Sequence, residues 1–237
     1  MAEIMPGVHV VDGVGMPGRP GTVNVCLLVD KDECTLIDAG FPGVGQPLSA
    51  ALASLGMPAT SVRRIIVTHH HFDHTGGLAE AVRLTGAEVW AHTADAGFID
   101  GSVPRAVPAW VREGTGAPAV TASAMKPEPV AVTLRLVGGE ELGVLGGIRI
   151  LHTPGHTPGH LSLLLPELSL LIAGDALRYE DGMVGGAPEH YNADTARAHE
   201  TIRELIALDF EHMLPYHGDY LSAEASTKAR ADLAATP

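Results

Sequence analysis

The heptapeptide THHHFDH, residues 68–74, gathers four histidines and one aspartate in a chain of 237 residues that has 13 histidines in total. It directly follows RRIIVT (63–68), an apolar, β-branched run that predicts a buried strand. Side chains two residues apart share a face only when the chain is extended. We therefore expect His69 and His71 to face one way and His70 to face the other.

A helix over the same stretch is the alternative, because it would bring His70 and His74 onto one face. Helical zinc sites of that kind use a glutamate as the base, and this stretch has none. The β-branched lead-in and the Gly76–Gly77 pair favour a loop at the end of the strand. The predicted ligands in this loop are His69, His71, Asp73 and His74.

A second histidine-rich stretch is HTPGHTPGH, residues 152–160. Its histidines are four residues apart, which would align them on a helix, but Pro154 and Pro158 exclude a helix here. The stretch is therefore expected to be a rigid loop between strands that presents an imidazole at a fixed place. Two apolar runs, LIAGD and LPYHGD, carry further donors at their ends, Asp175 and His217.

These stretches together supply a set of candidate metal ligands. The set is His69, His71, Asp73, His74, His156, Asp175 and His217. Imidazole and carboxylate donors without thiolate suit zinc, iron or manganese. Seven donors are too many for one tetrahedral ion, and they suit two divalent ions about 3.5–4 Å apart with a bridging carboxylate.

Short β-branched runs and helical segments occur in both halves of the chain. Strands are expected at 9–11, 22–30, 34–40, 63–68, 87–92, 130–137, 148–153, 160–166, 168–175 and 212–217, and helices at 44–56, 76–86, 193–209 and 222–234. This order predicts an α/β fold in which two sheets pack face to face with helices outside.

The charge of the chain limits its partners. The net charge is −13 and the 15 Lys and Arg residues are scattered, so nucleic acid and anionic membrane surfaces are disfavoured. Cys26 and Cys34 do not form a secreted disulfide framework. No leader pattern opens the chain and no apolar run reaches about 18 residues. We expect a soluble, cytoplasmic protein that acts on a small molecule.

The motifs resemble those of the metallo-β-lactamase-fold hydrolases. H-x-H-x-D-H at 69–74, TPGHTPGH, AGD, YHGD and LIDAG with Asp38 occur in that family's order, from about residue 22 to 219. The resemblance implies one domain over residues 1–237, built as an αββα four-layer sandwich of two mixed sheets flanked by helices. It places the metal site at one edge of the sheets.

The resemblance also implies a role for each candidate ligand. It assigns His69, His71 and His156 to a first metal, and Asp73, His74 and His217 to a second, most simply zinc, with iron or manganese as alternatives. It makes Asp175 the bridge between the two ions, with Asp38 supporting the site from outside the ligand set. His160 is expected in a similar supporting position.

Two close cations would generate hydroxide from a bridging water, which would attack an ester, lactone, thioester or phosphoester. Asp73 is then the candidate for proton transfer. Related lactonases carry a tyrosine three residues after the bridging aspartate; here Arg178 occupies that place and Tyr179 follows it. Tyr179, Tyr191 or Tyr216 could donate a hydrogen bond to the developing oxyanion, and Tyr179 is the candidate chosen here.

Other branches and classes are distinguished by smaller features. True β-lactamases of the fold generally lack an aspartate at the position of Asp175. Glyoxalase II has a C-terminal helical region that binds glutathione, and only 18 residues follow YHGD here. Persulfide dioxygenases of the fold are oxidoreductases that use a single iron, and a metal-binding regulator without turnover is a third class. Metal content separates these alternatives.

Residues 93–128 interrupt the regular pattern. They contain four prolines and the apolar residues Phe98, Val103, Val107, Trp110 and Val111. Long irregular segments in compact domains are usually functional, so a lid over the site or a homodimer contact is expected. The alternative is that these residues cover the core. An apolar lid would favour neutral or weakly charged, partly apolar esters or lactones.

Overall fold

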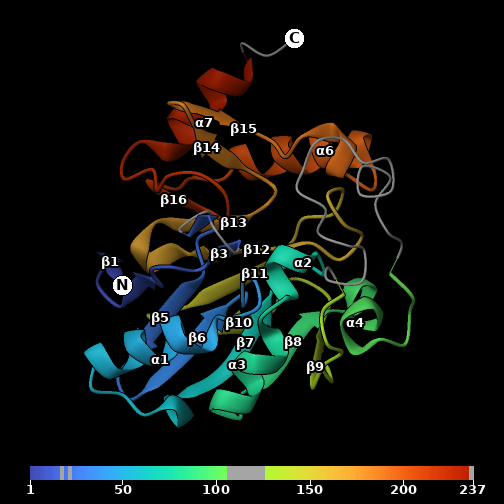
Figure 1. The fold of residues 1–237 in the computed structure, drawn as a ribbon. Helices are drawn as coiled ribbons and strands as arrows, with labels where there is room; N and C mark the ends of the chain where they lie inside the picture. The colour runs from blue at the N-terminus through green and yellow to red at the C-terminus, as the bar shows by residue number, and fades with distance from the viewer. Residues whose placement is uncertain (17–18, 21–22, 106–125, 235–237) are drawn as a thin grey trace.

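The computed structural model describes residues 1–16, 19–20, 23–105 and 126–234 (Figure 1). The first and larger sheet consists of β1 (Ala2–Met5), β2 (Val8–Val10), β5 (Cys26–Asp30), β6 (Glu33–Ile37), β7 (Val62–Val67), β8 (Glu88–His92) and β9 (Leu134–Leu136). These strands are hydrogen-bonded in the order β1-β2-β5-β6-β7-β8-β9. The β1-to-β6 pairs are antiparallel and the β6-to-β9 pairs are parallel, so the sheet is mixed.

The second sheet uses the later part of the chain. Its strands are β10 (Glu141–Leu142), β11 (Ile148–His152), β12 (Leu161–Leu165), β13 (Leu170–Gly174) and β16 (His212–Pro215). They are paired in this order, antiparallel as far as β13 and parallel between β13 and β16. Two short ribbons complete the strands: β3 (Gly15–Met16) with β4 (Arg19–Pro20), and β14 (Arg178–Glu180) with β15 (Met183–Gly185).

Helices cover the outer faces of both sheets (Figure 1). The α-helices are α1 (Gly45–Ser54), α2 (Phe72–Thr75), α3 (Leu78–Thr85), α4 (Thr93–Asp100), α6 (Thr195–Ile206) and α7 (Ala225–Ala234), and the 3-10 turns are η1 (Ala59–Ser61), η2 (Pro166–Leu168) and η3 (Glu189–Tyr191). One apolar cluster joins α1 and α3 to the first sheet, a second fills the space between the sheets, and a third joins α6 and α7 to the second sheet. These four layers confirm the predicted αββα sandwich.

The central strands are apolar on both faces because each sheet is buried on both sides. In β7, Ile65 packs under the helices while its neighbour Ile66 faces the other sheet. In β12, Leu163 faces the first sheet and Leu164 faces α6 and α7. This double burial explains why the sequence has continuous apolar runs at these strands instead of an alternation with polar residues.

The strand directions bring several loops to one end of the sandwich. β6, β7 and β8 are parallel, and β11, β13 and β16 also run in a common direction. At this end the backbone N–H of Leu161 donates to the carbonyl of Thr68 (2.8 Å), and that of Tyr216 donates to Gly174 (3.0 Å). The loops after β6, β7, β11, β13 and β16 therefore meet at the same edge.

Two local predictions need correction. Asp73 and His74 lie in α2 and not in a loop, and a four-residue helix is too short to give a periodic signal. The irregular segment expected at 93–128 begins with a regular helix, α4, whose N-terminus is capped when His92 Nδ1 accepts from the Ala94 N–H (3.1 Å). Val107, Trp110 and Val111 lie outside the described residues, so the lid and dimer contact stay predictions.

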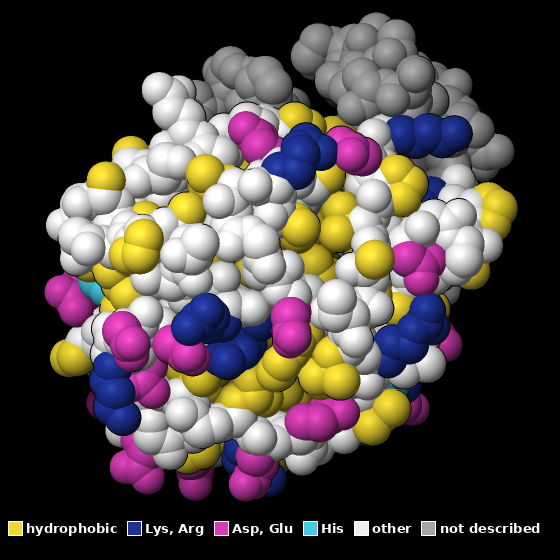
Figure 2. Space-filling view, turned by 90° about the horizontal axis from the view of Figure 1, so that it is seen from below, with side chains coloured by type: hydrophobic (Ala, Val, Ile, Leu, Met, Phe, Trp, Pro, Cys, Tyr) yellow, Lys and Arg dark blue, Asp and Glu magenta, His cyan; other side chains and the backbone are white. Residues whose placement is uncertain are grey.

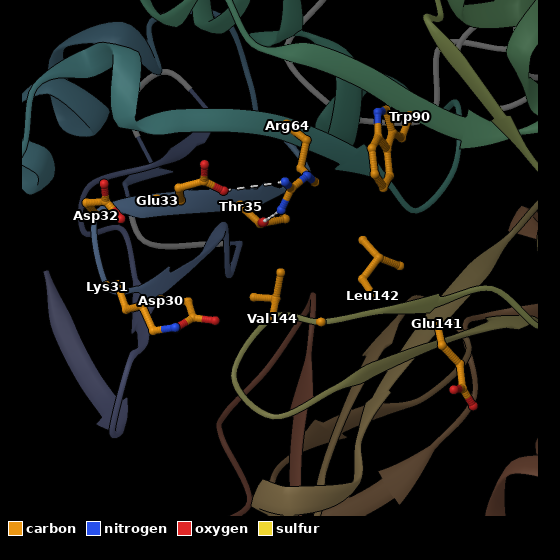
Figure 3. Close-up of a pocket in the computed structure, with 11 residues that line it drawn as sticks. Asp30, Lys31, Asp32, Glu33, Thr35, Arg64, Trp90, Glu141, Leu142 and Val144 are labelled. Atoms are coloured by element: carbon orange, nitrogen blue, oxygen red, sulfur yellow. Dashed lines mark hydrogen bonds and ion pairs between the residues drawn. The ribbon is translucent and has the colours of Figure 1, made fainter.

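A hollow of about 480 Å³ lies at the opposite end of the strands (Figure 3). There the Arg64 guanidinium lies 5.3 Å from the centroid of the Trp90 ring and donates to Thr35 Oγ1 (3.0 Å). Leu142 and Val144 line the other side. The hollow contains none of the predicted ligands. On the face drawn in Figure 2, acidic and basic side chains are interspersed around exposed hydrophobic ones.

Candidate metal centre

The first group of donors comes from the loops after β7 and β11. His69 and His71 lie in the extended segment that leads into α2, and His156 lies in the loop between β11 and β12. One ring nitrogen from each of the three lies within 4.8 Å of the others. His156 Nε2 and His71 Nδ1 are 3.0 Å apart, and His69 Nε2 is buried without a hydrogen-bond partner.

The second group takes its donors from α2 and from the end of β16. Its members are Asp73, His74 and His217, again with ligand atoms within 4.8 Å of one another. His217 Nε2 is 3.0 Å from Asp73 Oδ2, and His74 Nε2 is 3.7 Å from the same oxygen. His74 is fully buried, whereas Asp73 and His217 are partly exposed, so this group borders the solvent side of the centre.

Asp175 lies between the two groups. Its Oδ1 is 3.3 Å from His74 Nε2, and its Oδ2 is 3.4 Å from His156 Nε2 and 3.6 Å from His217 Nε2. One carboxylate therefore faces imidazoles of both groups. Asp175 Oδ1 and His74 Nε2 are also buried atoms without a hydrogen-bond partner.

The residues fit a metal on distance and on chemistry. Bonds of about 2.0–2.1 Å around a tetrahedral ion place neighbouring ligand atoms about 3.3 Å apart. The separations between donors above run from 3.0 to 3.7 Å, and three of the donor atoms, His69 Nε2, His74 Nε2 and Asp175 Oδ1, have no hydrogen-bond partner. Buried polar atoms are rarely left unpaired, so the three orphaned atoms need an electrophile. The centre thus has the donors and the spacing to hold divalent metal.

The electrostatics of the first group keep its imidazoles neutral. Burial lowers the pKa of His69 well below its usual value, and the neighbouring histidines lower it further. Burial and His156 lower the pKa of His71 to about 3, and burial also lowers that of His156. Neutral imidazole is the form that binds metal, so no proton has to leave these rings at neutral pH.

Three carboxylates, those of Asp38, Asp73 and Asp175, concentrate negative charge around His74 of the second group. Burial alone would lower the pKa of His74, but Asp38, Asp73 and Asp175 raise it well above the usual value. Burial would raise the pKa of Asp73 and Asp175, but His74 and His217 hold both below the normal range, Asp73 at about 2. The carboxylates around His74 therefore favour a positive charge at this position.

Asp38 and His160 contact proposed ligands and belong to neither donor group. Asp38 accepts from the Thr68 N–H (2.8 Å), from Thr68 Oγ1 (2.7 Å) and from His74 Nδ1 (2.8 Å). His160 is fixed by Thr153 Oγ1 (2.7 Å) and accepts from the Asp175 N–H (3.0 Å). Both therefore orient residues that carry the metal donors.

Three further residues contact ligands or the loops that carry them, and the sequence analysis did not assign them this role. The Tyr216 hydroxyl donates to the Asp73 carbonyl (2.5 Å), and its ring stacks on His74. Asn192 Oδ1 is 3.1 Å from His156 Nδ1. The third is Asp95 of α4, which lies in the segment 93–128 that the sequence analysis treated as irregular. Tyr216 lies within the YHGD motif, so the sequence could have indicated it. Asn192 and Asp95 belong to none of the motifs described above.

Two other residues lie away from the donors. His70 faces away from them, as the alternation predicted: its Nδ1 is 2.8 Å from Asp95 Oδ2 and its ring stacks on Phe98. Tyr179 packs its ring against the third apolar cluster, with the Lys228 ammonium 5.9 Å from the ring centroid. Its role as a hydrogen-bond donor to the oxyanion stays a prediction.

Comparison with known proteins agrees with this centre and its fold. The chain is 29% identical to the probable metallo-hydrolase YflN of Bacillus subtilis strain 168, over 90% of each protein. It is 32% identical to a hydroxyacylglutathione hydrolase of Pseudomonas aeruginosa strain LESB58, over 78% of this chain but only 57% of that enzyme. A metallo-beta-lactamase family protein of Thermus thermophilus superposes with a TM-score of 0.74 at 27% identity, covering 97% of this chain and 79% of that one.

The match to a family is equally extensive. Residues 18–217 match the family model of the Metallo-beta-lactamase superfamily, a range that contains every predicted metal ligand. In the described parts of the chain, no helix is long and apolar enough to cross a membrane. The match in sequence, the four-layer fold and the paired donor groups agree with one another, and the chain therefore belongs to the metallo-beta-lactamase superfamily as a hydrolase of that fold.

Proposed function

We propose that the protein is a dinuclear metallo-hydrolase, most simply with two zinc ions, that cleaves an ester, lactone, thioester or phosphoester. The observation that carries the proposal is the position of Asp175 between two complete donor groups. In this proposal His69, His71 and His156 would hold one ion, Asp73, His74 and His217 would hold the other, and Asp175 would contribute to holding both.

The side chains divide the remaining work. When bound, two such ions would lower the pKa of a water molecule towards neutrality and polarise the group under attack. Asp73 lies on the partly exposed side of the centre with its Oδ2 towards His217 and His74, so its other carboxylate oxygen would be left to take up a proton and pass it to the leaving group. Tyr216 holds the Asp73 backbone during that transfer. Tyr179 has no part in the proposal, because its ring packs elsewhere.

The substrate class is proposed from the relatives and from the site. A relative named hydroxyacylglutathione hydrolase supports an acyl thioester, yet this chain spans only 57% of that enzyme's length. Glutathione recognition is therefore not part of the proposal. The apolar composition of residues 93–128 supports neutral or weakly charged, partly apolar esters, lactones and thioesters as the first substrates to test.

The decisive experiment measures metal content and turnover on the same sample. Protein loaded separately with zinc, iron or manganese is analysed for bound metal and assayed on ester, lactone, thioester and phosphoester panels, with persulfide oxidation as a further assay. We expect two ions per chain and hydrolysis that stops when the metal is chelated and returns with zinc. One iron per chain with persulfide oxidation would establish the oxidoreductase alternative. Two bound ions without hydrolysis of any panel member would refute the enzymatic proposal.

A further inference from the structure

Asp95, in the first turn of α4, is a fully buried carboxylate outside both donor groups. Its Oδ2 accepts from the His70 backbone N–H (2.9 Å), from His70 Nδ1 (2.8 Å) and from Thr157 Oγ1 (2.8 Å). Its Oδ1 accepts from the Gly159 N–H (2.7 Å). A carboxylate has about four acceptor positions, so these donors saturate it.

The attachment points lie next to proposed metal ligands on two separate loops. His70 stands between His69 and His71, and Thr157 directly follows His156. Asp95 therefore connects the two segments that together make the first donor group, although no ligand touches it directly. Burial would raise the pKa of Asp95, but its hydrogen bonds from His70 and Thr157 hold it at about 2, so the anion persists at neutral pH.

The loop comes so close to Asp95 that only glycine fits at residue 159. A Cβ at Gly159 would lie 2.6 Å from Asp95 Oδ1 and 2.7 Å from the Asp95 backbone nitrogen. Neither atom belongs to a flexible side-chain end that can move away cheaply, because Asp95 is fixed by its other donors. This close approach therefore fixes α4 against the loop that carries His156.

We propose that Asp95 is a positioning residue for the first metal group, and that it sets the spacing between the His69–His71 segment and His156. The inference rests on the proposed metal function of these histidines. The second group has different supports, since Asp38 contacts His74 and Tyr216 holds Asp73. Loss of Asp95 should therefore lower the affinity of the first donor group for metal and leave that of the second group unchanged. A purely structural role would not produce this selectivity.

Asp95→Asn changes the contact with minimal change in shape. The amide retains one acceptor oxygen, so its NH₂ group must face a donor: the Gly159 N–H if the oxygen keeps the His70 side, or the His70 N–H otherwise. Gly159→Ala disturbs the same contact from the loop while Asp95 remains. Thr157→Val is a milder variant that removes a single donor. Asp100→Asn on the same helix is the matched control, because Asp100 contacts Ser102 and Arg135 and not the loops.

The test measures zinc affinity by competition with a chromophoric chelator in two backgrounds. His217→Ala leaves the first group intact, and His156→Ala leaves the second. We expect Asp95→Asn and Gly159→Ala to weaken zinc binding about 10- to 100-fold in the His217→Ala background, and to change it less than about twofold in the His156→Ala background. Thr157→Val should show a smaller loss in the first background, and Asp100→Asn none.

The outcomes separate this inference from the proposed function. If the wild-type protein binds no zinc, both fail. If the wild type binds two ions and the Asp95 and Thr157 variants bind zinc normally in the His217→Ala background, or lose it equally in both backgrounds, the positioning role alone is refuted. Urea unfolding of each metal-free variant shows whether that variant is folded. If Asp95→Asn does not fold, the zinc affinity of Thr157→Val tests the positioning role instead.

Discussion

Asp38→Asn is a near-isosteric change that tests how the second donor group is prepared for metal. Asp38 has a left-handed backbone (φ 60°), which asparagine tolerates as well as aspartate does. One carboxylate oxygen accepts from the Thr68 N–H, which cannot reverse its role, so the amide oxygen must stay there. The new NH₂ group then faces His74 Nδ1, which is 2.8 Å from the native oxygen.

This geometry removes the anion that holds a proton on His74 Nδ1. Without metal, the raised pKa keeps the wild-type ring protonated on both nitrogens, and Asp38 retains the Nδ1 proton when Nε2, the atom that faces Asp175, is released for metal. In Asp38→Asn, Nδ1 instead accepts from the amide, so the ring keeps its proton on Nε2. Restoring the metal-binding tautomer then costs about one charge-assisted hydrogen bond, roughly 1.5–3 kcal/mol. Because each 1.4 kcal/mol is about tenfold in affinity, zinc should bind the second group about 10- to 100-fold more weakly.

The assay is chelator competition with zinc in a His156→Ala background, which leaves the second group. Asp30→Asn is the matched control, since the Asp30 carboxylate accepts from the Leu145 N–H (3.0 Å) and lies at the other end of the sandwich. Unchanged zinc affinity in folded Asp38→Asn protein would show that Asp38 does not select the tautomer of His74, and would refute this account of the second group.

Four further outcomes are expected. Asp175→Ala should remove most turnover and reduce bound zinc below two ions per chain, measured by elemental analysis; retention of two tightly held ions would contradict a shared carboxylate. His70→Ala keeps the backbone N–H that donates to Asp95, so both ions should still bind, with a smaller loss of affinity than in Asp95→Asn. Leu163→Ala empties a fully buried position between the sheets and should lower the free energy of unfolding by about 2–5 kcal/mol in urea titrations, with Val137→Ala on the exposed surface as the control. Asp95 has a folded-state pKa of about 2 against an ordinary value of 3.8, so it adds about 2 kcal/mol to the free energy of unfolding above pH 4, and this is lost as the pH falls towards 2. The difference in the free energy of unfolding between metal-free wild type and Asp95→Asn should therefore shrink over that range. A difference that stays constant would exclude this linkage.

The parts of the centre that the sequence predicts are those fixed by local geometry. The direction of His69, His71 and His70 follows from the strand that precedes them, and the proline-rich composition of 152–160 excludes a helix whatever surrounds it. The four-layer fold follows because apolar runs in both halves require burial on two faces. These features depend on neighbours in the chain, so they can be predicted from the sequence alone.

The parts that could not be predicted depend on distant segments that approach one another. Asp95 is hydrogen-bonded to Thr157 and Gly159, which are more than sixty residues away in the sequence, and no local pattern predicts that contact. Asn192 reaches His156 from a segment beyond β15 without any motif. Tyr179 follows Asp175 closely in the sequence, but the direction of its ring is set by packing against α7. Helix α2 is held by two loops that are distant in the sequence: the Ala39 N–H donates to the His74 carbonyl (2.9 Å), and the Tyr216 hydroxyl donates to the Asp73 carbonyl (2.5 Å).

The two sheets come from successive parts of the chain, residues 2–136 and 141–215, and each donor group draws on both. An ion in either group would therefore act as a cross-link between the two halves of the sandwich. Such a ligand at 100 times its dissociation constant adds about 2.7 kcal/mol to the free energy of unfolding. Metal supply would then govern the lifetime of the folded chain as well as its turnover, and the metal-free protein would be the form most exposed to proteolysis.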